Sequence, residues 1–210
     1  MHGELKAPYG DYWIITGFDE VGYHYAGWET GGPTPWEKLG DQFIPTLDVR
    51  SAVPCEAASD EVVVREAFRT ALWWAASPPE LGLAGDAHVG PDAYEAWAAS
   101  LEEGRALLNH HAYNASAWVE TREMAVAFLG EVKERLSRAD LDPLFDEAIG
   151  HYTAVRDRLA AVEAKYPVPH EGWEKRETVQ DEETAAVLRQ AGQAEELGLA
   201  VLGRIAAALE

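Results

Sequence analysis

The feature that most constrains this chain is the spacing of apolar side chains between Asp142 and Tyr166. They recur in alternating steps of three and four residues, at Phe145, Ala148, Tyr152, Val155, Leu159, Val162 and Tyr166. On a helix this spacing forms one continuous stripe, and it is the pattern by which helices pack nearly antiparallel in bundles. We therefore predict a long, one-sided helix that begins at Asp142-Pro143 and ends before Pro167.

Similar signals predict four more helices, over residues 59–77, 91–101, 110–136 and 182–209. Ser59 is a good N-cap, and acidic residues follow it in the first turn, where the helix dipole favours them. Pro91 suits the first position of the second helix. The expected fold is mainly α, an up-and-down bundle of four to five helices.

The first quarter of the chain has a different sequence pattern. Short runs of β-branched and aromatic residues, split by Gly and Pro, predict strands over 12–17, 22–26 and 46–53. The segment 31–35 (GGPTP) is interpreted as a break between the second run and Trp36. These runs predict a small three-stranded antiparallel sheet at the N-terminus. We therefore divide the chain into a β-rich module, residues 1–56, and a helical bundle, residues 57–210.

The amino-acid composition limits the classes of molecule that the protein is expected to bind. Hydrophobic residues make up 47% of the chain and eight residues are Trp, as expected for a folded globular protein. The net charge of -20, from 37 acidic and 17 basic residues, repels phosphate backbones and anionic lipids. We expect neither nucleic acid nor a membrane surface as a partner.

Cysteine content and hydropathy indicate the cellular compartment of the protein. Cys55 is the single cysteine, so neither a disulfide within the chain nor a thiolate metal cluster can form. The sequence has no uninterrupted apolar stretch of about 18 residues and no basic-then-apolar start. These features predict a cytoplasmic protein, and the Ala, Gly and Arg content is typical of a GC-rich bacterial genome.

The stretch from Tyr9 to Leu39 reads YGDYWIITGFDEVGYHYAGWETGGPTPWEKL. An apolar run meets Gly17-Phe18-Asp19-Glu20, and the aromatic run Tyr23-His24-Tyr25 follows, which predicts a hairpin. The stretch resembles the second, β-rich half of the C39-like (papain-type) fold, including relatives of the butirosin acyltransferase. In that family the hairpin supplies the catalytic His and then an Asp, and a Trp-x-x-Leu segment follows.

The resemblance implies cysteine-based acyl transfer, which needs a thiolate, an imidazole and an orienting carboxylate. The family's His position is occupied here by Asp11 or Tyr12, and its Asp position falls near Trp28-Glu29. Cys55 follows the hairpin, where the family has no nucleophile. We therefore expect a non-catalytic C39-like remnant that acts as a binding or oligomerisation module. The alternative is half of a split cysteine acyltransferase or peptidase-like enzyme, completed by a separate chain that supplies the Cys.

Adjacent histidines, His110 and His111, open the predicted third helix. Neighbours on a helix point about 100° apart, so the two cannot share one metal ion, but either could join a carboxylate from another helix. A metal-dependent hydrolase in the bundle is thus a third class of function. The alternative is that these histidines pack or hydrogen-bond locally, and no cofactor is predicted.

Polar residues interrupt two apolar stripes. The third helix carries His111, Asn114 and Arg122 on its apolar face, and the last helix carries Glu195. A lone buried charge costs several kcal/mol, so a salt bridge between Arg122 and Glu195 would satisfy both. The four residues form either a buried polar cluster that fixes helix register or the floor of a ligand pocket. A third interpretation is that both charged side chains extend outward to water.

Self-association is the expected partnership. A β module without its companion half exposes an edge strand and aromatic side chains, and a second copy of the chain is the simplest cover. We therefore expect a homodimer that buries Trp28 or Trp36, the alternative being a monomer. The sequence does not identify a small-molecule ligand.

Overall fold

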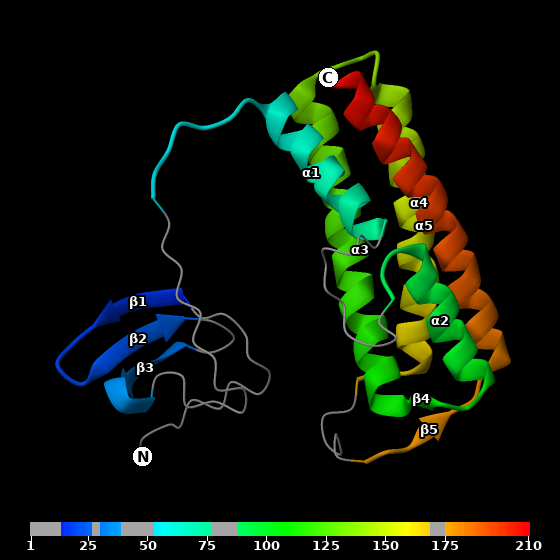
Figure 1. Cartoon of the computed structure of the whole chain (residues 1–210), viewed down its shortest axis with the longest axis horizontal. Helices are drawn as coiled ribbons and strands as arrows, with labels where there is room; N and C mark the ends of the chain where they lie inside the picture. The colour runs from blue at the N-terminus through cyan, green and yellow to red at the C-terminus, as the bar shows by residue number, and fades with distance from the viewer. Residues whose placement is uncertain (1–13, 27–29, 39–52, 77–87, 169–174) are drawn as a thin grey trace. The chain divides into compact units, whose positions relative to one another are not determined.

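The computed structural model describes residues 14–26, 30–38, 53–76, 88–168 and 175–210 (Figure 1). Contacts divide the chain into two compact units, Met1–Glu56 and Ala57–Glu210. The first unit holds a small sheet and the second holds the long helices. Every described helix is too short or too polar to cross a lipid bilayer.

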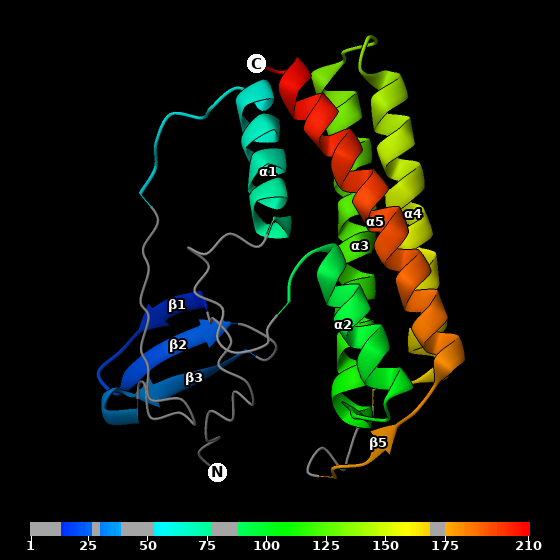
Figure 2. The same cartoon turned by 45° about the vertical axis from the view of Figure 1, so that its right-hand side comes forward.

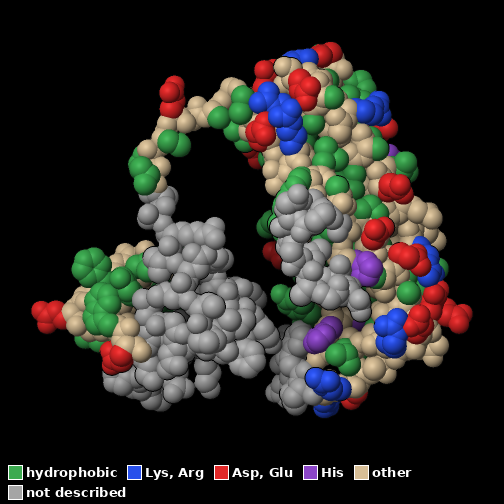
Figure 3. All heavy atoms as spheres, viewed as in Figure 1, with side chains coloured by type: hydrophobic (Ala, Val, Ile, Leu, Met, Phe, Trp, Pro, Cys, Tyr) green, Lys and Arg blue, Asp and Glu red, His purple; other side chains and the backbone are tan. Residues whose placement is uncertain are grey.

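The N-terminal unit contains a three-stranded antiparallel sheet in the order β1-β2-β3. Its elements are β1 (Ile14–Phe18), β2 (Gly22–Ala26), β3 (Thr30–Pro35) and a short 3-10 helix, η1 (Trp36–Lys38). The predicted hairpin is therefore confirmed, although residues 12 and 13 lie outside the described residues. Hydrophobic side chains gather over this sheet (Figure 3), and those of Ile14 and Phe18 are 72% and 74% exposed.

Asp19 shapes the turn between β1 and β2. Its Oδ1 accepts hydrogen bonds from the backbone N–H groups of Val21, at 2.8 Å, and Gly22, at 3.1 Å. Its Oδ2 lies 2.9 Å from Nε2 of His24. The bond from Val21, and then those from His24 and Gly22, lower the pKa of the Asp19 carboxyl. Aspartate commonly stabilises a turn by bonding the backbone just beyond it, and this accounts for the hairpin.

The third strand differs from the prediction. The structure places β3 at Thr30–Pro35, across the segment that we interpreted as a break. Proline is excluded from central strands because it lacks an N–H, but β3 is an edge strand of the described sheet, where that group is not needed. Gly22 lets β3 approach, since a Cβ there would lie 1.7 Å from the Thr34 carbonyl oxygen. Most of the predicted third strand, residues 46–52, lies outside the described residues, and Val53 is in no strand.

The C-terminal unit is helical, as predicted. Its described helices are α1 (Asp60–Ala75), α2 (Pro91–Glu102), α3 (Leu108–Leu136), α4 (Asp142–Lys165) and α5 (Glu182–Ala208). A two-residue antiparallel ladder joins β4 (Ala106–Leu107), before α3, to β5 (Thr178–Val179), before α5. Ser59 caps α1 through a hydrogen bond that its Oγ accepts from the N–H of Val62. The fold is therefore mainly α with a small N-terminal sheet.

The long helices α3, α4 and α5 lie side by side and alternate in direction (Figures 1 and 2). The shorter α1 and α2 follow one another along the same side of this group, so that five helices occupy the four positions of an up-and-down bundle. Gly90 makes the junction between α1 and α2 close. It has a φ of 61°, and a Cβ there would lie 2.6 Å from the Ala75 carbonyl oxygen.

The bundle core consists of two groups of buried side chains. The group toward the C-terminal end of α5 includes Phe68, Leu129, Phe145, Tyr152, Val201 and Ile205. The other includes Tyr94, Leu101, Ala115, Val119, Leu159 and Leu188. The stripe predicted for α4 is buried from Phe145 to Val162. On α3 and α5 the core passes from one group to the other near Arg122 and Glu195, so the predicted polar pair lies at the boundary between them.

Candidate functional site

Arg122 of α3 and Glu195 of α5 form the predicted salt bridge. Nε of Arg122 donates to Oε2 of Glu195 at 2.8 Å, and the two side chains are 19% and 8% exposed. Burial opposes the positive charge, yet the pKa of Arg122 is raised, because the Glu195 carboxylate more than compensates. The pair is thus a largely enclosed, charge-neutral unit that links the third and last helices.

Tyr94 of α2 completes the unit. Its hydroxyl donates to Oε2 of Glu195 at 3.0 Å and accepts from Nη2 of Arg122 at 3.3 Å. Burial and the neighbouring carboxylate raise the pKa of this phenol, so it stays protonated at neutral pH. The guanidinium also lies 5.5 Å from the ring centre of Trp118, within cation–π range. Three helices therefore converge on one carboxylate oxygen.

Two glycines on α5 make room for tyrosines on either side of Glu195. A Cβ at Gly192 would lie 3.0 Å from Cβ of Tyr94, and one at Gly198 would lie 2.9 Å from Cε2 of Tyr152. Each glycine stands three residues from Glu195, so all three positions share one face of the helix. The sequence Gly-x-x-Glu-x-x-Gly thus allows Tyr94 and Tyr152 to flank the carboxylate.

A cleft of about 380 Å³ opens beside this unit. Arg122 and Glu195 are the charged residues among those that line it, and Tyr152 lies beside them. Its walls are largely apolar and come from α1, α3 and α5, through Ala67, Phe68, Ala71, Trp74, Ala125, Phe128, Leu129, Leu199 and Leu202, while α4 contributes Tyr152. This volume lies within the range of small-molecule sites, which are mostly apolar with a few convergent polar groups.

His111 lies apart from the ion pair. Its buried ring accepts a hydrogen bond at Nδ1 from Nε1 of Trp97, at 2.9 Å, and meets the ring of Tyr166 edge to face with centres 4.5 Å apart. Trp118 separates it from Arg122, since Trp118 contacts Trp97 on one side and the guanidinium on the other. Burial lowers the pKa of His111 to about 4, so the imidazole is neutral at pH 7. It belongs to an aromatic cluster next to the site.

Asn114 does not join the cluster. The side chain is exposed, whereas the prediction placed it on the inner face of the third helix. In the first half of α3 the buried face includes Ala112, Ala115 and Val119 together with His111, so only Asn114 of the two predicted polar residues is turned outward. Small alanines face the core there, and the side chain of Asn114 lies on the solvent side.

The metal hypothesis receives no support from the described residues. His110 is exposed and His111 is held by Trp97, so the two do not converge on a carboxylate. In the described part of the chain, no group of three or more His, Cys, Asp or Glu side chains is placed to hold a metal ion.

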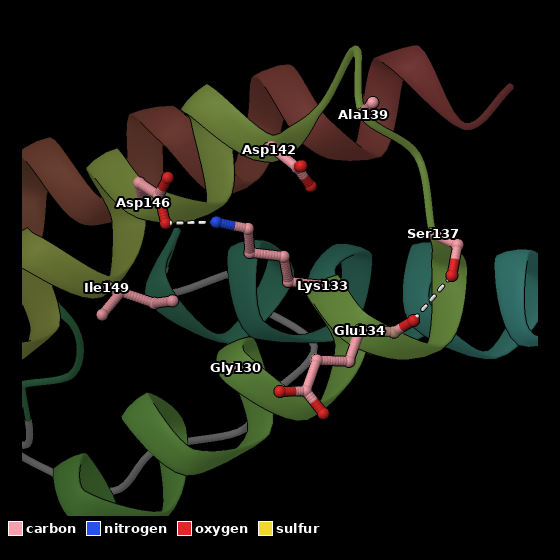
Figure 4. A pocket seen from close by; sticks show the side chains of 8 residues that line it. All are labelled: Gly130, Lys133, Glu134, Ser137, Ala139, Asp142, Asp146 and Ile149. Carbon is pink, nitrogen blue, oxygen red and sulfur yellow. Dashed lines mark hydrogen bonds and ion pairs between the residues drawn. The ribbon is translucent and has the colours of Figure 1, made fainter.

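A second depression, of about 510 Å³, lies where α3 turns into α4. Lys133 reaches across it and donates to Oδ1 of Asp146 at 2.6 Å, with Asp142 beside them (Figure 4). The Lys133 and Asp146 side chains are 28% and 65% exposed, and exposed pairs of this kind contribute little. Because its charged groups are already paired with one another or open to solvent, we regard this depression as a surface feature.

The residues bearing on cysteine chemistry lie in the N-terminal unit. Cys55 is exposed, and within the described residues no imidazole contacts its thiol. His24 bonds to Asp19, as an oriented imidazole would in a catalytic site, but that bond forms across the turn of the hairpin. The described residues therefore do not assemble the three roles that acyl transfer needs.

Sequence reasoning missed two residues of the site, Tyr94 as a partner of the ion pair and Tyr152 as a lining residue. Tyr152 belongs to the predicted apolar stripe of the fourth helix, where it counted as an ordinary core aromatic. The signal that could have identified them was the pair of glycines three residues before and after Glu195, because glycine inside a helix is costly unless something packs against it.

No family model, curated protein or solved structure matches this chain. The C39-like resemblance of residues 9–39 therefore stays a prediction from the sequence.

Proposed function

We propose that this protein is a non-catalytic binding module, and that its helical unit holds a small, mainly apolar molecule in the cleft between α1, α3, α4 and α5. The observation that carries the proposal is an apolar cleft of about 380 Å³ whose charged lining residues, Arg122 and Glu195, neutralise one another. Apolar walls would supply the affinity, because their burial removes surface from water. The polar unit at one side would orient the ligand.

A purely structural role for the ion pair accounts for less of what is seen. Well-packed helix interfaces leave few voids larger than a water molecule. A pair that only fixed helix register would be enclosed by side chains, but Arg122 and Glu195 border open space together with Tyr152. Fixing the register and forming the floor of the cleft are compatible roles for the same salt bridge.

For the N-terminal unit we propose a C39-like remnant without a catalytic site of its own. The support is the hairpin of β1 and β2 and the sequence around it, which carry the resemblance. The single cysteine favours a cytoplasmic protein over a secreted one, and the described residues of this unit do not assemble the catalytic roles, which favours binding.

We further propose that the chain forms a homodimer through this unit. Ile14, Phe18 and Trp36 are exposed on it, and β1 and β3 are edges of the described sheet. Exposed apolar side chains beside strand edges favour association. Light scattering at micromolar concentration should give a mass of about twice the chain's 23.1 kDa, and a dimer that Trp36→Asp dissociates would support this face. A monomer would refute it.

The binding proposal is tested with toluene as an apolar probe. Saturation-transfer NMR on the full chain should show toluene bound to the wild type. In Ala125→Phe an added ring fills the cleft, so the signal should be lost. Ala127→Phe is the matched control, because Ala127 is exposed two residues along the same helix and should leave binding unchanged. Equal toluene signals from wild type and Ala125→Phe would refute the proposed site.

A further inference from the structure

Two polar atoms in the cleft have no hydrogen-bond partner among the described residues. Both bonds received by Glu195 go to Oε2, which leaves Oε1 without a donor. The Tyr152 hydroxyl feels the charges of Glu195 and Arg122 but bonds to neither. Both residues are more than nine-tenths buried, at 6% and 5% exposure for the whole residue, and both line the cleft.

These two atoms are not sealed inside the protein. Among the described residues, the side-chain nitrogen or oxygen that is both fully enclosed and without a hydrogen-bond partner is Nε2 of His111. Glu195 Oε1 and the Tyr152 hydroxyl are therefore reachable from the cleft. Polar groups in such surroundings are normally paired, so this pair of atoms marks the place where a ligand's polar group would bind.

The charges around these atoms limit what that group can be. Arg122 and Glu195 carry opposite charges and lie 2.8 Å apart, so the pair has no net charge before a ligand binds. A carboxylate would meet the Glu195 charge, and an ammonium would meet the Arg122 charge, in a cleft with largely apolar walls. Burying a net charge there would cost several kcal/mol, which a neutral group avoids.

The hydrogen-bonding roles limit it further. A carboxylate oxygen accepts, so Glu195 Oε1 needs a donor. The Tyr152 hydroxyl can donate into the cleft. From these roles, and resting on the proposed function of the cleft, we infer that the ligand bears a neutral group that both donates and accepts a hydrogen bond, as an alcohol or a primary amide does. Its donor would bond Glu195 Oε1, its acceptor would bond the Tyr152 hydroxyl, and its apolar remainder would lie against Phe68, Ala71 and Ala125.

The test compares four probes of similar size, 1-hexanol, hexanoate, hexylammonium and toluene, by NMR titration of the full chain at neutral pH. We expect 1-hexanol to bind, and hexanoate and hexylammonium to bind at least about tenfold more weakly. In Tyr152→Phe, affinity for 1-hexanol should fall by about three- to tenfold, while affinity for toluene should change by less than about twofold. Tyr152→Phe should fold, because the hydroxyl it removes has no protein partner among the described residues.

The outcomes separate the two proposals. If toluene binds but either charged probe matches 1-hexanol, the inferred neutral group is wrong. If toluene binds and Tyr152→Phe leaves 1-hexanol affinity unchanged, the inferred polar contact is wrong. If neither toluene nor 1-hexanol binds, the proposed function fails as well.

Discussion

Removing the charges of Arg122 and Glu195 singly and together gives the most informative stability prediction. Arg122→Met keeps the apolar stem of the side chain but leaves Glu195, 8% exposed, without its cation. At about 4 Å between charge centres and an effective dielectric constant of about 20, the lost attraction is about 4 kcal/mol. Breaking a buried pair typically costs about 3–5 kcal/mol, and we expect Arg122→Met to fall in that range.

The second single variant should cost less. Glu195→Gln leaves an arginine whose side chain is 19% exposed and so retains contact with water. The glutamine can also still accept from Tyr94, so we expect a loss of about 1–3 kcal/mol. In the double variant no charge is stranded, and the interaction free energy between the two sites should be about 2–3 kcal/mol.

Urea unfolding followed by far-ultraviolet circular dichroism measures these differences, because nearly all of the signal comes from the helical unit. The control cycle uses Arg189→Met and Glu95→Gln, an exposed pair that also joins α5 to another helix. Its coupling should be much smaller than that of the buried pair. Small, additive effects at Arg122 and Glu195 would mean that the pair does not link α3 to α5, and our reasoning about the bundle would be refuted.

Three further predictions concern side chains around the site. Gly198→Ala should destabilise the bundle by about 1–3 kcal/mol in thermal or urea unfolding, because its Cβ would lie 2.9 Å from the Tyr152 ring. Gly150→Ala should stabilise the bundle by up to about 1 kcal/mol, because nothing lies within 4 Å of the added Cβ. The opposite order of stabilities would contradict the packing. Tyr94→Phe removes the hydrogen bond to Glu195 and should lower the free energy of unfolding by about 1–3 kcal/mol. Tyr152→Phe should have a free energy of unfolding within about 0.5 kcal/mol of the wild type. Equal losses in the two variants would contradict the bonding pattern. Because burial lowers the pKa of His111 from 6.5 to about 4, the unfolded chain takes up the proton first as pH falls. The stability that neutral His111 provides should thus be complete above about pH 6.5 and decline by about 3 kcal/mol toward pH 4, and His111→Gln should flatten that slope in unfolding measured across this range.

The sequence predicted those parts of the fold in which local and tertiary preferences agree. The alternating stripe from Phe145 to Val162 is buried throughout α4, because a helix between two neighbours needs one continuous apolar face. In the first half of α3 the same reasoning was wrong for Asn114, whereas His111 is buried as predicted. Ala112 and Ala115 occupy the core there, whereas the predicted face had placed Asn114 inward. Hydrophobic periodicity locates a face, but the distance between helices decides which residues occupy its centre.

The N-terminal sheet shows a different limit. Asp19 and the flanking β-formers fixed the hairpin, since both signals are local. The strand at Thr30–Pro35 was missed because its Gly and Pro residues disfavour a strand in general, and only its edge position makes them acceptable. Edge position is a property of the whole sheet, which local sequence does not specify.

The candidate site was predictable in part for the same reason. Opposite charges on two apolar stripes predicted that Arg122 and Glu195 would pair, because an unpaired buried charge is too costly. The roles of Tyr94 and Tyr152 depend on which side chains reach the carboxylate from other helices, and on the space left between α1 and α3. Both follow from tertiary packing, which the stripes alone leave open.

We propose that the cleft beside Arg122 and Glu195 is a ligand site, and this can be tested directly. The most direct measurement is a crystal structure of the full chain soaked with bromobenzene, in which anomalous scattering from bromine reports the position of the bound molecule. We predict a bromine peak bordered by Ala71, Ala125 and Leu202, in the apolar part of the cleft. Bromobenzene bound elsewhere while this cleft stays empty, or no ordered bromine at all, would contradict the proposed site.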